Sequence, residues 1–335
     1  LHYNRSSMLA AEQTLTRLAE IPNITVLQDA PLARYTRFGI GGPADIYAEA
    51  AGEDAFLRAE ETAREAGIAC MVMGAGTKRG VGAMGRVDMV VSTARLDRII
   101  DYAPEELVLT VQPGVRVSDL ERLVASRGQM LAFEPPNWTG LLAARSEPTL
   151  GGVLAANLSG PRRIRAGAAR DHFLGFEAVS GRGEMFKAGG KVVKNVTGYD
   201  LMKLMAGSWG TLAILTEVTI KVLPAPRAET TLMLFGLADV KAGEAMGVAM
   251  NGPFEVSGAA HLPVFAARAR PLKADMAVTA LRLEGFAASV AARAESLASA
   301  LKGFGRIETL DADQSREFWS QVREVEAFAG DPRPL

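Results

Sequence analysis

Several residue types are scarce in this chain of 335 residues, and each scarcity excludes a kind of protein. A single cysteine, Cys70, rules out an internal disulfide and a cysteine-based metal cluster, and it fits a reducing compartment. The three histidines, His2, His172 and His261, stand far apart and lack metal-ligand spacing, so we predict no metal site. The sequence contains no Gly-x-Ser-x-Gly or similar nucleophile motif.

The chain also lacks an excess of charge of one sign and long hydrophobic runs. Its formal net charge is −1, which gives no reason to expect nucleic acid or an anionic membrane surface as a partner. The longest apolar runs are too short to span a bilayer, and residues 1–10 lack the apolar region of a signal peptide. We therefore expect a cytoplasmic protein that meets the inner face of a membrane only through a partner. The chain does not begin with Met, so we expect the true N-terminus to lie elsewhere.

The composition does provide for a sizeable core, because 48% of the residues are hydrophobic, and the length predicts roughly two domains of about 150 residues each. We expect residues 1–35 to form a helical lead-in whose pattern stops at Pro22. The run Pro-Ala-Pro-Arg at 224–227 is the clearest linker in the chain. It separates a first domain at 36–225 from a smaller α+β domain at 226–335, in which strands and helices alternate.

Local patterns near the start of the first domain predict a β-α-β unit. Residues 45–48 have strand character, residues 53–66 have helical character up to Gly67, and the apolar run 68–73 is typical of a buried strand. Cys70 would then be a small core residue. Further along we expect a helix at 117–126, an irregular loop at 133–148, a hairpin turn at 180–183 and a strand at 212–223.

A first glycine cluster follows that buried strand directly. Its glycines leave consecutive backbone N–H groups open, which is what a pyrophosphate needs, and its threonine and two basic residues add a hydroxyl and positive charge. The full Gly-x-Gly-x-x-Gly spacing of a Rossmann site is missing, and a simple tight turn stays open as an alternative. The candidate binding residues are Gly74, Ala75, Gly76, Thr77, Lys78, Arg79 and Gly80.

A second cluster of small residues leaves one face of its segment nearly bare. A bare face allows a flat ring or a ribityl chain to lie against backbone, although close packing against a neighbouring helix uses the same small residues. Asn157 and Ser159 favour the ligand in our interpretation, since both offer polar atoms. The candidates are Thr149, Gly151, Gly152, Ala155, Asn157, Ser159 and Gly160.

A third cluster lies in the stretch 194–212, where glycines permit close approach or positive φ. Tyr199 and Asp200 place polar atoms beside apolar residues, and a buried pair would need hydrogen-bond partners. An internal network that only holds the fold is the alternative. The candidates here are Gly198, Tyr199, Gly210, Thr211 and Ile214.

Together the three clusters favour one elongated phosphorylated ligand, and FAD has that shape. A basic stretch after the second cluster would suit a phosphate, a carboxylate substrate, a partner subunit or solvent, so all four interpretations stay open. No residue stands out as a catalytic base, and the catalytic residues stay unassigned. The arginines of that stretch are Arg162, Arg163, Arg165 and Arg170.

These motifs, in this order, resemble the FAD-binding domain of the vanillyl-alcohol-oxidase/p-cresol-methylhydroxylase type. Within that group they are similar to the FAD-binding E subunits of bacterial glycolate oxidase. The resemblance implies an α+β fold, with a two-subdomain FAD-binding domain followed by a smaller α+β cap domain. It is carried by residues 74–80, 101–110, 127–136, 149–175 and 191–224. Residues 35–45 instead resemble UDP-N-acetylenolpyruvoylglucosamine reductase, which shares the FAD-binding fold.

The resemblance implies a subunit that oxidises glycolate, a small 2-hydroxy acid, to glyoxylate. It also implies a second FAD-binding subunit and an iron–sulfur subunit as partners that receive the electrons. FAD would be bound non-covalently, because the loop 74–80 contains no His or Cys. Two alternatives stay open: an NADPH-using reductase of peptidoglycan synthesis and a non-catalytic assembly subunit. Members of the glycolate oxidase family would continue beyond Leu335, so we expect a truncated C-terminus.

Overall fold

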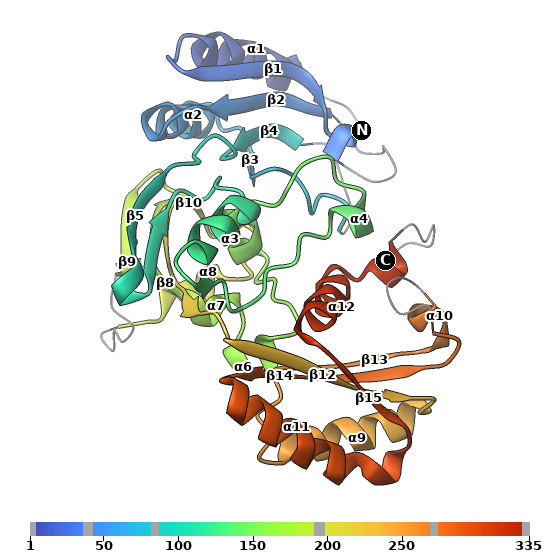
Figure 1. Ribbon diagram of the computed structural model, residues 1–335. Helices are drawn as coiled ribbons and strands as arrows, with labels where there is room; N and C mark the ends of the chain where they lie inside the picture. Colours follow the sequence, from blue (N-terminus) through green and yellow to red (C-terminus); the bar gives the residue numbers. More distant parts are fainter. Residues whose placement is uncertain (1–4, 36–42, 82–86, 191–197, 269–273, 330–335) are drawn as a thin grey trace.

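The computed structural model describes residues 5–35, 43–81, 87–190, 198–268 and 274–329. Three main sheets follow one another along the chain, and Figure 1 shows them from the blue end at the top to the red end at the bottom. Helices and strands are both abundant, so the predicted α+β class is confirmed. Within the described residues, no helix combines the length and the apolarity needed to cross a bilayer.

The first sheet has the strand order β1-β2-β4-β3. Strands β2, β4 and β3 are parallel, and β1 pairs antiparallel with β2. Two helices cover this sheet, and their apolar side chains meet it in a core that includes Leu18, Ile46, Phe56 and Met89. The elements are α1 (Arg5–Ala19), β1 (Ile24–Pro31), η1 (Leu32–Tyr35), β2 (Pro43–Ala50), α2 (Glu53–Glu65), β3 (Cys70–Met73) and β4 (Val87–Ser92).

Two expectations for this region are wrong. The helical lead-in at 1–35 is helical only as far as Ala19, because Ile24–Pro31 forms a strand that pairs with β2 in register from Ile24↔Ala50. Its three consecutive β-branched residues, Ile24, Thr25 and Val26, suit a strand, and pairing along β2 outweighs the helical pattern upstream. Cys70 is exposed rather than a core residue, since β3 lies at the edge of the sheet and β4 stands between it and β2.

The second sheet has five antiparallel strands in the order β5-β6-β10-β8-β9. In its core, Leu109, Val111 and Val218 of the strands cluster with Val153 of a short helix. The strands are β5 (Ile99–Ala103), β6 (Val108–Val111), β8 (Phe173–Ser180), β9 (Met185–Gly189) and β10 (Ala213–Lys221). The helices are η2 (Pro104–Glu106), α3 (Val117–Ala125), α4 (Thr139–Leu142), α5 (Leu150–Ala155), α6 (Arg163–Ala166), α7 (Ala169–His172) and α8 (Leu201–Met205).

The third sheet is antiparallel, with the order β13-β14-β12-β15, and begins just after a two-stranded ladder of β7 and β11. Helices α9 and α11 cover one face and α12 the other, where Phe318 and Trp319 are buried against the strands (Figure 1). The elements are β7 (Gln129–Met130), β11 (Leu223–Pro224), β12 (Ala228–Phe235), α9 (Asp239–Asn251), β13 (Gly258–Leu262), α10 (Val264–Ala267), β14 (Val278–Gly285), α11 (Ala287–Leu301), η3 (Lys302–Phe304), β15 (Ile307–Leu310), α12 (Ala312–Glu324) and η4 (Glu326–Phe328).

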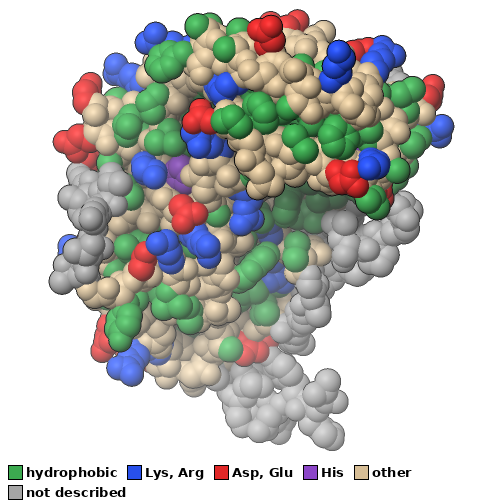
Figure 2. All heavy atoms as spheres, turned by 90° about the horizontal axis from the view of Figure 1, so that it is seen from below, with side chains coloured by type: hydrophobic (Ala, Val, Ile, Leu, Met, Phe, Trp, Pro, Cys, Tyr) green, Lys and Arg blue, Asp and Glu red, His purple; other side chains and the backbone are tan. Residues whose placement is uncertain are grey.

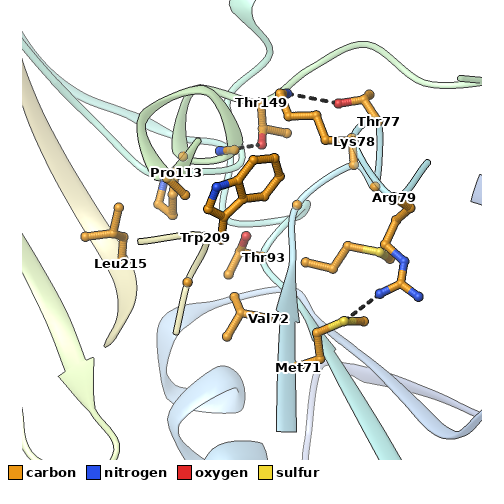
Figure 3. A pocket seen from close by; sticks show the side chains of 18 of the residues that line it. Met71, Val72, Thr77, Lys78, Arg79, Thr93, Pro113, Thr149, Trp209 and Leu215 are labelled. Carbon is orange, nitrogen blue, oxygen red and sulfur yellow. Dashed lines mark hydrogen bonds between the residues drawn. The ribbon is translucent and has the colours of Figure 1, made fainter. Parts of the chain in front are cut away.

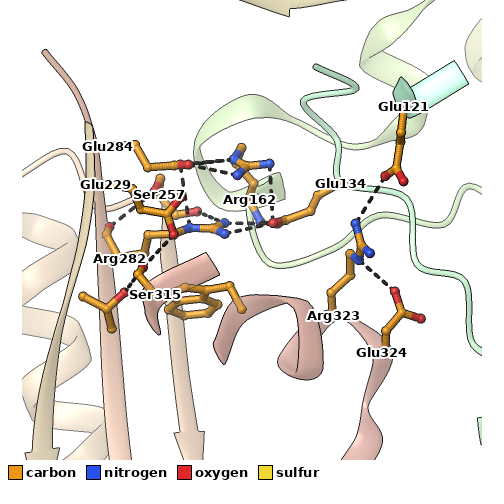
Figure 4. Close-up of polar contacts among 12 residues, drawn as sticks. Glu121, Glu134, Arg162, Glu229, Ser257, Arg282, Glu284, Ser315, Arg323 and Glu324 are labelled. Carbon is orange, nitrogen blue, oxygen red and sulfur yellow. Dashed lines mark hydrogen bonds and ion pairs between the residues drawn. The ribbon is translucent and has the colours of Figure 1, made fainter. Parts of the chain in front are cut away.

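A buried ionic joint connects the third sheet to the chain before it (Figure 4). Arg282 of β14 donates two hydrogen bonds to the carboxylate of Glu134, at 2.8 and 3.0 Å. In return, Arg162 donates to the carboxylate of Glu284 at 2.9 to 3.3 Å. All four side chains are at least 86% buried, the least buried being Arg162 at 14% exposure. Buried charges of this kind are stable only when paired, so the two crossed pairs fix the third sheet against the preceding chain.

Charged side chains of both signs are interspersed over the face that Figure 2 shows, the side seen from below Figure 1. That mixture agrees with the formal net charge of −1. Dense positive patches are the usual footprint of nucleic-acid binding, and this face carries charges of both signs instead.

Candidate functional site

A cavity of about 310 Å³ lies where the first and second sheets meet (Figure 3). Three segments that are far apart in the sequence line it: the end of β3 with the loop that follows, the start of α5, and the turn between α8 and β10. Ile214, with Val179, belongs to the buried cluster of the first sheet, so the two sheets pack together beside the cavity. The loops at strand ends are therefore held on a rigid framework.

The first wall is the glycine loop after β3. Gly76 has φ +70°, which glycine adopts without steric cost. Gly74 allows a close approach between segments, because a Cβ there would lie 2.4 Å from the Thr149 hydroxyl. Thr77 is buried, and its hydroxyl accepts a hydrogen bond from Lys78 Nζ at 3.1 Å. The loop thus places backbone, a hydroxyl and an ammonium group at one end of the cavity.

The second wall is the first turn of α5. Thr149 precedes the helix, and its hydroxyl accepts a hydrogen bond from the Gly152 N–H at 3.3 Å. Gly151 lies against Pro113, where a Cβ would come within 2.5 Å of the proline Cβ. Gly152 and Ala155 leave the cavity side of this turn nearly free of side chains, as the bare-face interpretation predicts.

Two positively charged side chains, those of Lys78 and Arg79, line the cavity. Burial lowers the pKa of Lys78 to about 8 and also lowers the pKa of Arg79. Within the part of the chain that the structure describes, neither side chain forms an ion pair with a carboxylate. The Nε of Arg79 is buried without a hydrogen-bond partner, and its Nη1 lies 2.5 Å from the sulfur of Met71. Partly buried cations without counter-ions fit an anionic ligand such as a pyrophosphate.

The third wall is the turn that follows α8. The backbone N–H of Trp209 donates to the Ala155 carbonyl at 2.9 Å, and that of Gly207 donates to the Leu154 carbonyl at 3.2 Å. These bonds tie the turn to α5. Gly210 has φ +75°, and the position of its missing Cβ is 3.6 Å from the Cβ of Val72, so the turn also lies against β3.

The structure brings most of the first two predicted clusters together and little of the third. The predicted residues that line the cavity are Gly74, Ala75, Gly76, Thr77, Lys78, Arg79, Thr149, Gly151, Gly152, Ala155 and Gly210. Those that lie outside its lining are Gly80, Asn157, Ser159, Gly160, Gly198, Tyr199, Thr211 and Ile214. Residues 194–197 of the third predicted stretch lie outside the described residues.

Polar residues of the second cluster serve the fold. The side-chain oxygen of Asn157 accepts from the Arg170 N–H at 3.0 Å, and the hydroxyl of Ser159 accepts from the Ala169 N–H at 2.8 Å, so both hold the start of α7. Gly160 is packed on Glu134, where a Cβ would lie 2.4 Å from the carbonyl oxygen. Local side-chain to backbone hydrogen bonds therefore use the atoms that we interpreted as ligand contacts.

Residues of the third cluster also lie away from the cavity or bond within the fold. Tyr199 is 93% exposed and is not part of a buried network. Asp200 caps α8, accepting from the Lys203 N–H at 3.2 Å and pairing with its ammonium group at 2.8 Å. The hydroxyl of Thr211 donates to the Ser208 carbonyl at 2.6 Å. Ile214 is buried between the first two sheets.

The sequence interpretation missed the other residues that line the cavity, which are mostly apolar. Most come from strands or turns and carry no polar group that would have singled them out. Trp209 is the exception, because an aromatic residue between Gly207 and Gly210 in a ligand-binding stretch is a readable signal. The missed lining residues are Met71, Val72, Met73, Val81, Val87, Thr93, Pro113, Met205, Ser208, Trp209, Ala213 and Leu215.

Curated proteins of known name are similar to this chain. Glycolate oxidase subunit GlcE of Escherichia coli (strain K12) is 36% identical over 229 residues, which cover 68% of this chain and 55% of the relative. Glycolate oxidase subunit GlcD of Bacillus subtilis (strain 168) is 37% identical over 145 residues, covering 43% and 29%. UDP-N-acetylenolpyruvoylglucosamine reductase of Solibacter usitatus (strain Ellin6076) is 36% identical over 162 residues, covering 47% and 50%. The chain thus spans at most about half the length of these relatives.

The fold has solved counterparts as well. The crystal structure of p-cresol methylhydroxylase with substrate bound superimposes with a TM-score of 0.70 at 12% identity, covering 97% of this chain and 72% of that one. Residues 44–189 match the protein family described as an FAD binding domain. The predicted fold and the predicted FAD cofactor are therefore confirmed, because residues 44–189 match an FAD binding domain and the chain shares the fold of p-cresol methylhydroxylase.

Proposed function

We propose that this chain is the FAD-binding subunit of a glycolate oxidase, an FAD-dependent oxidoreductase that removes electrons from a small 2-hydroxy acid. The observation that carries the proposal is the cavity with two uncompensated cations beside glycine-lined backbone, Lys78 and Arg79 against Gly151 and Gly152. The similarity to GlcE supplies the substrate class. When bound, FAD supplies the electron acceptor, and the protein binds and orients it.

Different residues of the cavity would bind different parts of FAD. The open backbone of residues 74–79, together with Lys78 and Arg79, would hold the pyrophosphate. The bare side of α5 at 151–155 would lie against the flat and ribityl parts of the cofactor. Neither a His nor a Cys is among the described residues that line the cavity, and this supports non-covalent binding. Loop 74–80, which contains neither residue type, supports it too.

The proposal divides the chain into an FAD-binding part and a cap. The cavity is lined as far as Leu215, and the third sheet begins at Ala228, so a boundary near 225 suits both. Pairing of β1 with β2 extends the FAD-binding part back to Ile24. The cap would then be the third sheet with its helices, at 226–335.

The partners in this proposal are a second FAD-binding subunit and an iron–sulfur subunit, with contact to the inner face of the membrane only through them. Two relatives carry the names of different subunits of one oxidase, which supports an assembly. The basic stretch also supports an assembly, because Arg162 and Arg165 are already paired and are poorly placed to bind a substrate. Arg162 is occupied by Glu284 and Glu134, and Arg165 pairs with Glu255 at 2.8 Å. Substrate chemistry would therefore depend on the assembled complex.

A second candidate is the NADPH-dependent reductase of peptidoglycan synthesis, favoured by 36% identity over 162 residues to a relative of that name. The test measures anaerobic reduction of the flavin by its loss of absorbance. It is carried out on the chain alone and on the chain co-expressed with its partners. We expect glycolate to bleach the flavin in the complex and NADPH alone to leave it oxidised. Bleaching of the isolated chain by NADPH, followed by reoxidation of the flavin when the enolpyruvyl nucleotide sugar is added anaerobically, would instead assign the reductase.

A further inference from the structure

Trp209 stands out among the residues that line the cavity. Its side chain is 52% exposed, and in Figure 3 the indole projects into the space among the lining residues. Within the described residues, no hydrogen bond holds the indole N–H and no other ring packs against Trp209. A large aromatic surface that the fold leaves uncovered is costly in water.

The backbone at Trp209 is also held in an unusual conformation. Its φ is +55°, in the left-handed region that bulky residues rarely adopt, between Gly207 at +87° and Gly210 at +75°. The turn is fastened there, because the Trp209 N–H donates to Ala155 O at 2.9 Å and Gly210 lies against Val72. A non-glycine residue kept in this region points to a function for its side chain. Here the strained backbone fixes where the ring stands.

The surroundings suit a flat heteroaromatic ligand. The cavity that the indole enters is also lined by the bare side of α5 and by apolar side chains, among them Val72 and Leu215. The phosphate-binding end, with Lys78 and Arg79, belongs to the same cavity. A ligand with a diphosphate at one end of the cavity would thus bring an attached ring system within reach of the indole.

We propose that Trp209 is a positioning residue that stacks on one of the two flat heteroaromatic rings of FAD. This inference rests on the proposed FAD site and adds to it a residue that holds the ring in place. Stacking on an aromatic side chain depends on the π-face of the ligand, which the adenine and the isoalloxazine ring both have. The indole would become buried when the cofactor binds.

The experiment compares FAD binding by the full chain, freed of flavin, with that of three variants. Trp209→Gly removes the ring and takes φ +55° without strain, so it keeps the turn. Trp209→Phe keeps a smaller ring. Leu204→Ala is the matched control, since Leu204 is 56% exposed in the neighbouring helix and does not line the cavity. Circular dichroism checks that every variant is folded.

We expect Trp209→Gly to raise the Kd for FAD by roughly tenfold or more, Trp209→Phe by less than about threefold, and Leu204→Ala not at all. FAD should quench tryptophan fluorescence in the wild-type protein and much less in Trp209→Phe. Titration with ADP and with FMN assigns the ring, because only the half that stacks on Trp209 quenches. Wild-type affinity in Trp209→Gly, or equal quenching in Trp209→Phe, would overturn the inference. A wild-type chain that binds no FAD would instead refute the proposed function.

Discussion

Lys78 shows how a single residue can be kept in a costly state for a ligand. Burial lowers its pKa from 10.5 to about 8, and its ammonium group faces the cavity with only the Thr77 hydroxyl as a partner in the described residues. Because the pKa of Lys78 is lower in the folded protein than in the unfolded chain, protonation of its amine destabilises the fold. The contribution of Lys78 to stability is full above pH 10.5 and is lost as the pH falls through about 8. At pH 7 the free protein therefore carries an unfavourable buried charge that a phosphate would neutralise.

This balance predicts opposite effects of Lys78→Met on stability and on binding. The free protein should gain about 1 to 3 kcal/mol at pH 7 because the buried charge is gone. Affinity for FAD should fall by roughly tenfold or more because a charge-assisted contact is lost. Chemical denaturation and calorimetric titration measure the two quantities. Lys187→Met is the control, since Lys187 is 80% exposed, pairs with Glu177 and lies outside the cavity lining.

The same group predicts how FAD binding depends on pH. In the wild-type protein, affinity should be level below about pH 8 and should fall at higher pH, as free Lys78 loses the proton that the phosphate requires. Lys78→Met should remove that fall. An equal fall in the variant would show that another group is responsible.

Residue type alone selected some residues that line the cavity and others that lie outside its lining. Gly74 and Gly151 were predicted because glycine leaves the backbone open to a ligand, and in the fold a Cβ at either position would clash with a neighbouring segment, at Thr149 or Pro113. Asn157 and Ser159 were predicted as ligand contacts because their polar atoms look available. In the fold those atoms accept backbone N–H groups at the start of α7, a local use that sequence cannot separate from ligand binding.

Among the elements, the joint between β14 and the loop at 131–136 brings together four buried charged side chains. Glu134 has φ +56° and accepts hydrogen bonds from both Arg282 nitrogens and from the Arg162 N–H. Burial acts to raise the pKa of Glu134, but the hydrogen bonds and charges of Arg282 and Arg162 outweigh it and hold that pKa below 4.5. Nearby, burial raises the pKa of Glu229, whose carboxylate accepts from the Ser315 hydroxyl at 2.6 Å.

Removing one partner from this joint should be severe. Glu134→Ala leaves Arg282 and Arg162 without their shared carboxylate, and we expect a loss of about 3 to 5 kcal/mol in the free energy of unfolding at pH 7. Glu255→Ala breaks the Arg165 pair that bridges the same two parts of the chain, and both of those partners are more than half exposed. The 3.8 Å contact of Glu255 with the more buried Arg293 is also lost, but Arg293 keeps its hydrogen bonds to the Phe254 and Glu284 carbonyls, so the variant should cost less than about 1 kcal/mol. Urea unfolding measures both variants.

The pH dependence adds a second criterion for the joint. Because the pKa of Glu134 is lowered in the folded state, its contribution is present above its unfolded value and is lost as the pH falls through the folded value. The variant should therefore differ most from the wild-type protein at neutral pH and least in acid. Equal losses for Glu134→Ala and Glu255→Ala would contradict a special role for the buried joint.

Elements with strong periodicity were predictable, and elements set by distant pairing were not. The hairpin of β8 and β9, the strand β10 and the helix α3 lie close to where their local patterns place them. Strand β1 was missed because it is defined by pairing with β2, across a gap in the sequence. The position of β4 between β2 and β3 is likewise a property of the sheet and not of any local pattern.

For the whole molecule, the proposed FAD-binding part comes first along the chain and the proposed cap follows it. Two sheets meet at the cavity, and the third sheet is fixed to them by the ionic joint and by Glu324, which accepts from the N–H groups of Asn137 and Trp138. The α+β class was predictable, because strand and helix patterns alternate along the sequence. The joint itself was not, because Glu134, Arg162 and Arg282 meet only after folding.

The central claim is that the chain binds FAD non-covalently in the cavity between the first two sheets. The most direct measurement is the absorbance spectrum of the full chain after incubation with FAD and gel filtration, followed by acid precipitation. We expect the bands of oxidised flavin to elute with the protein and all of the flavin to appear in the supernatant after precipitation. Protein that elutes without flavin would contradict the claim, and flavin that remains in the pellet would contradict its non-covalent part.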